Sequence, residues 1–351
     1  MLDLMGEHLA STLVGLVGGV LLGLAARLGR FCTLGAIEDL LYGGSDLRMR
    51  MWGVAIGIAI LGSFALMAAG ALDPGQSIYL SFEWLPLASV LGGLMFGYGM
   101  ALAGNCGFGA LARLGGGDLR SFVIVLVMGV TALTVISGPL APLRAALFPV
   151  TPITDTVPGI AHRLAPMLGL SVPLVGMGLG LALLVWALAS RALWAKPAHI
   201  AWGTVVGVAV LTGWAGTHYV AVTGFEALRP VSHSFAAPLG ESVLWFMTGS
   251  ARPLTFAVGS VAGVWIGAFA GSLIKGHFRW EACEDPRELR RQIFGAGLMG
   301  AGAVIALGCT IGQGISAFSL LALSAPVTFA AIFAGAALGL RQLVEGFRRI
   351  V

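Results

Sequence analysis

Charged residues are scarce in this sequence. Asp, Glu, Lys and Arg together make up 10% of its 351 residues, whereas a soluble domain carries about 25%. Hydrophobic residues make up 58% of the chain, and the mean hydropathy is +0.93. This shortage of charge excludes most classes of soluble protein, so we expect residues 1–351 to form a single all-α integral membrane domain.

Two further features are rare or absent. Only four cysteines occur, too few for a disulfide framework in a chain of this length. The first ten residues contain Asp3 and Glu7 but no Lys or Arg, so they do not resemble a secretory signal, and we expect the first apolar run to remain as a span. The sequence pI of about 9.1 does not indicate nucleic-acid binding, because the basic residues lie in short clusters between apolar runs.

What the sequence does contain is a series of long apolar runs. A helix needs roughly 20 mostly apolar residues to cross the core of a bilayer. We therefore predict about nine transmembrane helices, at approximately 11–28, 51–71, 86–104, 121–138, 170–190, 200–220, 253–274, 292–308 and 327–344.

The distribution of basic residues predicts the orientation of these helices. With the N-terminus placed outside, sixteen of the twenty Lys and Arg residues fall in cytoplasmic segments. Cytoplasmic loops of membrane proteins carry such an excess. The C-terminus is then cytoplasmic, and a single missed span would invert every later segment.

Three of the loops between spans share one motif, Cys-x-x-Gly. It occurs as Cys32 to Gly35 after the first span, Cys106 to Gly109 after the third and Cys309 to Gly312 after the eighth. Each motif is followed by an apolar stretch that is too short to cross the membrane. A fourth loop, after the sixth span, aligns less well and has Ala237 and Gly240 at the two motif positions.

The order of spans and loops predicts two halves of opposite orientation. We assign residues 1–138 to the first half, 139–199 to an outer segment with a linker helix, and 200–351 to the second half. The linker adds one helix between two similar halves, so the second half is inverted, and its loops enter from the other face. Inverted repeats whose broken helices meet near the bilayer midplane are typical of transporters, and some channels also use opposed half-helices.

The stretches after the three cysteines provide the predicted binding chemistry. We expect a half-helix in each, over Leu34 to Leu41, Ala110 to Leu114 and Ile315 to Leu323, with its N-terminus beside the thiol. Free backbone N–H groups and the helix dipole favour an anion there. No Lys or Arg lies in the middle of a predicted span, so dipoles and weak donors are expected to hold the anion. The candidate substrate-binding residues are Cys32, Gly35, Asn105, Cys106, Gly107, Gly109, Cys309, Thr310, Gly312 and Gln313.

A thiol is soft, polarizable and a weak hydrogen-bond donor. These properties suit a sulfur-bearing anion, a soft metal ion such as Cu(I), or a relay in which a persulfidated cysteine passes sulfur inward. The cytoplasmic segments lack a Cys/His cluster, and no acid/base group accompanies the cysteines, so we expect a transporter without metal or cofactor rather than an enzyme. The sequence assigns no role to Cys283, His218, His233 or residues 139–169.

The chain resembles the YeeE/YedE sulfur-transport family at three motifs. They are Gly29-Arg30-Phe31-Cys32-Thr33-Leu34-Gly35-Ala36, Ala103-Gly104-Asn105-Cys106-Gly107-Phe108-Gly109 and Leu307-Gly308-Cys309-Thr310-Ile311-Gly312-Gln313-Gly314. Because these motifs fall in both halves, the resemblance covers nearly the whole chain. It implies an hourglass-like protein of the bacterial inner membrane, with short helices folded inward from both faces.

The resemblance also implies a substrate and a partner. Three functional cysteines, Cys32, Cys106 and Cys309, would line a central path for thiosulfate. A small cytoplasmic TusA-like sulfur carrier would act as a separate chain. Part of the family is associated with selenium or other sulfur species, and the motifs do not separate these substrates.

Overall fold

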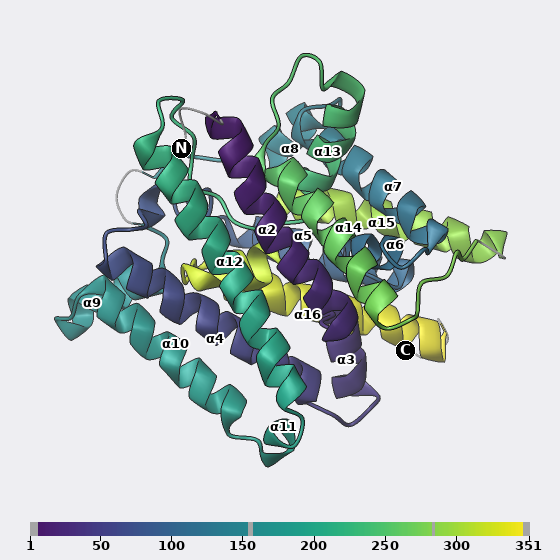
Figure 1. The fold of residues 1–351 in the computed structure, drawn as a ribbon, viewed down its shortest axis with the longest axis horizontal. Helices are drawn as coiled ribbons and strands as arrows, with labels where there is room; N and C mark the ends of the chain where they lie inside the picture. Colours follow the sequence, from purple (N-terminus) through teal and green to yellow (C-terminus); the bar gives the residue numbers. More distant parts are fainter. Residues whose placement is uncertain (1–5, 154–156, 283–284, 347–351) are drawn as a thin grey trace.

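The computed structural model describes residues 6–153, 157–282 and 285–346, and within these ranges the regular secondary structure is helical, with three isolated β-bridges in addition. Each of the nine predicted spans overlaps one long helix (Figure 1). These helices are α2 (Glu7–Leu28), α4 (Leu47–Ala68), α5 (Pro86–Ala103), α7 (Leu119–Ile136), α10 (Val172–Leu188), α12 (Pro197–Thr223), α14 (Phe256–Ile274), α15 (Pro286–Ile305) and α16 (Ser324–Glu345).

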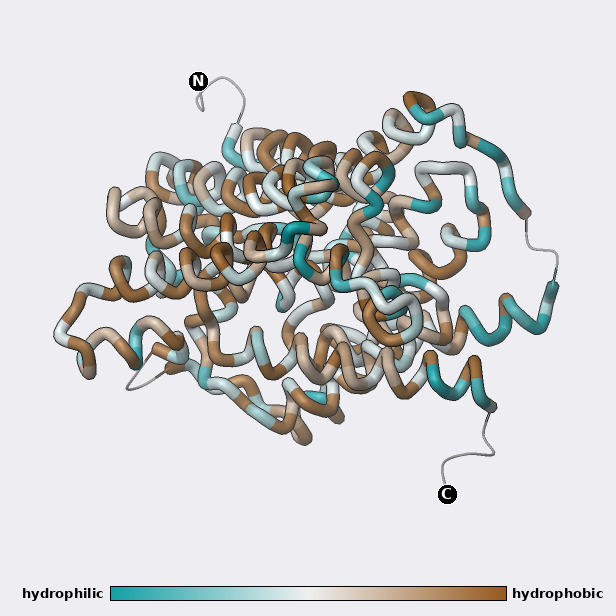
Figure 2. The backbone as a smooth tube through the Cα atoms, turned by 90° about the horizontal axis from the view of Figure 1, so that it is seen from below, coloured by the Kyte–Doolittle hydropathy of each residue, from teal (hydrophilic) through white to brown (hydrophobic). Residues whose placement is uncertain are grey.

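The helices have the length and composition of a membrane protein. Among the described residues, seven helical stretches are long and apolar enough to cross a bilayer, and an eighth is added if α9 (Ile160–Leu168) and α10, bent by 112°, form one span. α15 begins with charged residues, which lowers its apolarity. The all-α membrane fold is thus confirmed, while the number nine stays a prediction. Figure 2 shows the long helices mostly in brown, with hydrophilic residues concentrated in connecting segments and at helix ends.

The helices of the two halves pack against each other in reciprocal pairs. α2 packs on α14 as α12 packs on α4, and α5 packs on α16 as α15 packs on α7. Let α2, α4, α5 and α7 correspond to α12, α14, α15 and α16 in that order. The contact of α2 with α14 then corresponds to that of α12 with α4, and the contact of α5 with α16 corresponds to that of α15 with α7. Such reciprocity is what a two-fold relation between halves produces, while the inversion of the second half stays a prediction.

Small residues allow the backbones of α2 and α14 to touch. A Cβ atom added at Gly19 would lie 2.4 Å from the carbonyl oxygen of Ser260, and one added at Gly263 would lie 2.3 Å from that of Leu16. Glycines recur at every fourth position on both helices. Helices in a membrane gain little from burying apolar surface against each other, so close packing of small residues supplies much of their association.

Four short segments interrupt the long helices. Three are α-helices, α3 (Thr33–Leu41), α6 (Gly107–Leu114) and α13 (Ala237–Thr248), as the repeat predicts. The fourth differs from the expectation of a half-helix over Ile315 to Leu323, because Gly312–Ala317 forms a π-helix, η2. The segment starts three residues earlier than predicted. Its glycines and the backbone turn before it allow this early start; in that turn, Leu307 and Gly308 have φ angles of 55° and 159°.

The predicted outer segment, residues 139–169, contains α8 (Ala141–Leu147) and α9. It is tied to the second half by backbone hydrogen bonds, from Ile160 N–H to the Leu321 carbonyl at 2.7 Å and from Leu323 N–H to the Pro158 carbonyl at 2.9 Å. Two smaller helical turns, η1 (Pro74–Gln76) and α11 (Arg191–Trp194), complete the described helices.

Candidate functional site

The cysteines of the first half cap the short helices that follow them. Cys32 is the N-cap residue of α3, and Cys106 is the N-cap residue of α6, both with extended backbone. The first backbone N–H groups of each helix have no partner within the helix and point back toward the cap. Each thiol therefore lies beside the positive end of a helix dipole, as the motif predicted.

The Cys106 thiol is buried at the centre of the molecule. Its side chain is 1% exposed, and its sulfur accepts a hydrogen bond from the Gly109 N–H at 3.4 Å. Cys32 and Cys309 lie near this thiol. The structure thus brings the three predicted thiols into one neighbourhood, although their motifs are up to 277 positions apart in the sequence.

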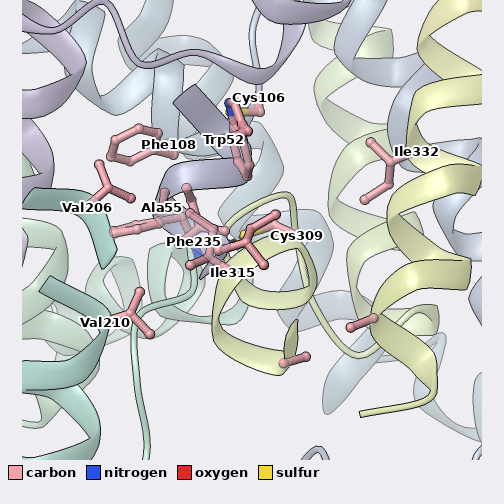
Figure 3. Close-up of a cluster of buried hydrophobic side chains, with 14 of the residues drawn as sticks. Trp52, Ala55, Cys106, Phe108, Val206, Val210, Phe235, Cys309, Ile315 and Ile332 are labelled. Carbon is pink, nitrogen blue, oxygen red and sulfur yellow. Dashed lines mark hydrogen bonds between the residues drawn. The ribbon is translucent and has the colours of Figure 1, made fainter. Parts of the chain in front are cut away.

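The Cys309 thiol is held by the loop that precedes α13. Its sulfur accepts hydrogen bonds from the Phe235 N–H at 3.2 Å and from the Gly312 N–H at 3.5 Å, and the Ser234 hydroxyl lies 3.8 Å away. Figure 3 shows Cys106, Phe108, Phe235 and Cys309 within one buried cluster of side chains. We call Cys106, Cys309, Thr310 and Phe235 the thiol junction, since segments entering from opposite faces meet there.

Two predicted glycines make this meeting possible. A Cβ atom at Gly107 would lie 2.7 Å from the Phe235 carbonyl oxygen and 2.6 Å from the Met128 sulfur. One at Gly312 would lie 2.7 Å from the Ser234 hydroxyl. No side chain fits at either position unless the opposing loop moves away. These glycines, which the sequence analysis predicts as substrate-binding residues, thus also allow the two loops to approach each other closely.

The polar side chains of the motifs have distinct surroundings. The Thr310 hydroxyl is fully buried and approaches the Cys106 thiol, but it forms no hydrogen bond of ordinary geometry. Gln313, in contrast, donates to the carbonyls of Ala306 and Leu307 at 2.8 and 3.3 Å and accepts from the Ser324 hydroxyl at 3.1 Å. Its amide is therefore occupied with the backbone turn before η2, whereas Thr310 retains its capacity to bind.

A cavity of about 450 Å³ leads toward the thiols from one face. Four of the predicted site residues line it, namely Cys32, Gly35, Asn105 and Gly109. We call this cavity the basic vestibule, because five cationic side chains also line it, those of Arg27, Arg30, Arg48, Arg113 and Lys275, with His277 beside them and Glu38 as the one carboxylate among its lining residues.

The basic vestibule adds cationic side chains to the dipoles and weak donors that the sequence predicts as the main groups for holding an anion. The cations lie at span ends in the sequence, but the fold turns them toward the N-terminus of α3. Gly35 leaves room for the Arg48 guanidinium, which would lie 2.3 Å from a Cβ atom at that position. Burial lowers the pKa of Lys275 from its ordinary value, and Arg30 and Arg27 lower it further. These cations repel one another, and an anion between them relieves that repulsion.

A second, narrower cavity of about 40 Å³ lies at the opposite end of α5. α5 begins at this cavity with Leu85 and ends at the basic vestibule with Gly104; at 1.5 Å per residue the helix spans about 27 Å. We call it the distal cavity. Its walls include Trp84, Phe148, Gln313, Ser324, Glu83 and Arg144.

Two residues of the distal cavity escaped the sequence analysis. Arg144, from the unassigned segment 139–169, has a buried Nε atom without a hydrogen-bond partner. Tyr79 lines the cavity, interacts electrostatically with Cys309 and lies close to Gly312. No repeated motif marked either residue; a single Arg in a segment placed outside by charge counting was the only available signal.

Of the other unassigned residues, His233 packs beside the thiol junction, with its ring stacked on that of Phe235 at a centroid distance of 6.5 Å. His233 is fully buried, and its Nδ1 atom lies 2.7 Å from the Ser260 hydroxyl. His218 is also buried, with its Nδ1 atom 3.4 Å from the Asp73 N–H. Cys283, to which the sequence assigns no role, lies outside the described residues.

Comparison with known proteins identifies the family. Residues 28–338 match the family described as "Sulphur transport". The chain is 28% identical over 327 residues to the "Thiosulfate transporter TsuA" of Escherichia coli (strain K12), covering 86% of each protein. It is 25% identical over 335 residues to the protein of the same name from Spirochaeta thermophila, covering 88% of this chain and 92% of that one. The chain therefore belongs to the sulphur transport family.

Proposed function

We propose that this protein takes up thiosulfate across the bacterial inner membrane, without acting as an enzyme on it. The observation that carries the proposal is the thiol junction, where segments from opposite faces bring Cys106 and Cys309 together between two cavities. Both relatives described above are named as thiosulfate transporters. The YeeE/YedE motifs around the three cysteines support a sulfur or selenium species as the substrate, a class that includes thiosulfate.

The proposed path runs from the distal cavity to the basic vestibule. Thiosulfate enters beside Arg144 and Tyr79, passes Cys309 and then Cys106, and leaves past Cys32. At the junction, backbone N–H groups donate to the sulfur lone pairs of Cys106 and Cys309, which leaves each S–H free to donate to the anion. A thiol is a weak donor, so the anion is held long enough to be selected and loosely enough to move on. No covalent bond forms or breaks.

The orientation of the protein in the membrane follows from charge. Sixteen of the twenty basic residues lie in segments that the span order assigns to one side, and such an excess marks the cytoplasm. The basic vestibule then opens inward, with the N-terminus outside and the C-terminus inside. A cytoplasmic TusA-like carrier would collect the product at this mouth as a separate chain.

The charge of the basic vestibule separates this proposal from cation transport. Five cationic side chains around the mouth would repel a soft metal ion but attract an anion. Selenium-containing anions share this preference, so they are distinguished by competition with thiosulfate. A persulfide relay instead predicts a stable mass increment on Cys106 after exposure to substrate, which the non-covalent path does not.

The first test is growth of a sulfate-uptake-deficient bacterium on thiosulfate as the sole sulfur source. We expect growth with the intact chain and none with Cys106→Ala at equal membrane abundance. Cys283→Ala serves as the matched control, because that cysteine lies outside the repeated motifs, and it should support normal growth. Normal growth with Cys106→Ala would refute a role for the thiol, and no growth with the intact chain would refute thiosulfate as the substrate.

A further inference from the structure

A third cavity, of about 350 Å³, opens beside the basic vestibule. It lies between the end of α2, the turn from α3 to α4 and the start of α12, at the end of the molecule where α3 and α11 lie in Figure 1. We call it the lateral cavity. Arg30 and Arg48 belong to both cavities, and they form the wall between them. Arg30 is fixed in this wall with a left-handed backbone, at a φ of 56°.

The charge of the lateral cavity is only partly balanced by protein groups. Arg30, Arg48 and Lys196 line it, with Asp39 as the one carboxylate among its lining residues. Asp39 pairs with Arg48 at 3.2 Å. Among the residues that the structure describes, no ion pair within 4 Å involves Arg30 or Lys196. Two unpaired cations that face one cavity favour a ligand with a compact negative charge.

Neutral donors complete the site. The Nδ1 atom of His199 is buried and has no hydrogen-bond partner, and the ring lines the cavity. Ala198, beside it, lies in the first turn of α12, where backbone N–H groups have no partner within the helix. Cations, an imidazole and the N-terminus of a 27-residue helix together suit the oxygen atoms of a phosphate group.

Aromatic residues place this cavity at the level of lipid headgroups. The Trp202 ring lines it and packs against Gly29 at the end of α2. Trp194, in the adjoining turn α11, is 61% exposed and donates its indole N–H to the Leu188 carbonyl at 2.9 Å. Tryptophan side chains gather where a membrane meets water, and basic pockets between helices at that level hold lipid phosphates.

We propose that the lateral cavity binds the phosphate group of an anionic phospholipid, held by Arg30, Lys196 and His199. Free phosphate carries the same chemistry, but the tryptophans and the position beside α12 favour the lipid. A bound phosphate would also neutralise part of the charge at the mouth of the basic vestibule. That consequence rests on the proposed function, whereas the binding itself does not.

The test is lipid retention by the purified full chain in a neutral detergent, measured by native mass spectrometry. The chain is offered equal amounts of phosphatidylglycerol and phosphatidylcholine with the same acyl chains. We expect preferential retention of phosphatidylglycerol. Lys196→Gln should weaken that retention about fivefold, as expected for one basic residue at a membrane surface, while Lys196→Arg should preserve it. Arg191→Gln, which removes an exposed charge from neighbouring α11, should also preserve it.

Each other outcome overturns the proposal. Equal retention of the two lipids would show that the cavity does not recognise the headgroup. Unchanged retention by a Lys196→Gln protein with normal thermal stability would place the lipid elsewhere. Saturable binding of inorganic phosphate without preference for phosphatidylglycerol would assign the cavity to a soluble ligand. No thiosulfate is present in these measurements, so their failure is distinct from failure of the uptake assay.

Discussion

The basic vestibule and the distal cavity lie at the two ends of α5 and differ in size, charge and lining. The basic vestibule measures about 450 Å³ and carries five cationic side chains, whereas the distal cavity measures about 40 Å³ and carries Arg144 among aromatic walls. A wide cationic chamber attracts anions of many kinds, because Coulomb attraction depends on charge and distance and not on the shape of the anion. A narrow cavity discriminates by size. On the proposed path, we expect the distal cavity and the thiol junction to select the anion, and we expect the basic vestibule to receive it before it leaves.

The largest loss of uptake is expected when a substitution forces apart the thiol junction between the two cavities. Gly107→Ala would place a Cβ atom 2.7 Å from the Phe235 carbonyl oxygen. Overpacking of this kind costs about 1–3 kcal/mol, which shifts the closed junction toward an open one about fivefold or more. We expect thiosulfate uptake into proteoliposomes to fall by at least that factor.

Gly178→Ala is the matched control for this loss. Gly178 lies in α10, and an added Cβ atom there meets no atom within 4 Å, so uptake should stay at the level of the intact chain. If both variants transport normally, the close approach of Gly107 to Phe235 has no part in transport. A leak of other anions through Gly107→Ala alone would instead show that the junction is the selective barrier.

The charge of the basic vestibule is tested by Arg113→Gln. Arg113 lines this cavity, and loss of one cation near an anion path should weaken apparent affinity about fivefold at low ionic strength. The deficit should shrink as salt rises, because exposed charges are screened. Arg290→Gln, at an exposed position in the first turns of α15, should leave the apparent KM unchanged. An Arg113→Gln deficit that does not depend on salt would contradict an electrostatic role.

A smaller effect is expected at the distal cavity. Arg144→Gln removes its cation, whose Nε atom has no hydrogen-bond partner in the described structure. We expect the KM for thiosulfate to rise about threefold with little change in maximal rate, because Arg144 acts at entry rather than at the junction. Arg163→Gln changes an exposed residue of α9 on the same segment and should have no effect. Equal KM values for the two variants would remove Arg144 from the path.

The sequence was sufficient to predict the long helices because their physical signal is local. Each span is a run of apolar residues that ends at charge or at a helix breaker, and every one overlaps an observed long helix. The short helices after Cys32 and Cys106 were also predictable, since a repeated motif marked both. The π-helix of η2 was not, because its start depends on the backbone turn at Leu307 and Gly308 and on the hydrogen bonds that Gln313 forms with this turn and with Ser324.

The site was less predictable where it depends on contacts distant in sequence. Nothing local indicates that the Phe235 N–H would donate to the sulfur of Cys309. The sequence places Arg48 at the end of a span, but in the fold its guanidinium lies next to Gly35. Trp52 has the position of a residue of the aromatic belt, but it is buried and stacked on Phe31, with ring centroids 4.5 Å apart.

The smallest effect on uptake, and the sharpest test of the junction, is expected from Thr310→Val. The Thr310 hydroxyl is fully buried and lacks a hydrogen bond of ordinary geometry, so replacing it with a methyl group should raise the thermal stability. If that hydroxyl is kept for the passing anion, uptake should fall about twofold while stability rises, as happens when a functional site holds an unsatisfied group.

Thr328 provides the control for this gain in thermal stability at the expense of uptake. Its hydroxyl in α16 is also fully buried and without a hydrogen-bond partner, but Thr328 is not part of the thiol junction and packs beside Gly93 of α5. Thr328→Val should therefore raise stability and leave uptake unchanged. If Thr310→Val gives the same result as Thr328→Val, both hydroxyls are packing defects. If only Thr310→Val loses uptake, its unsatisfied hydroxyl belongs to the path, and the boundary between the two cavities is a binding site rather than a plug.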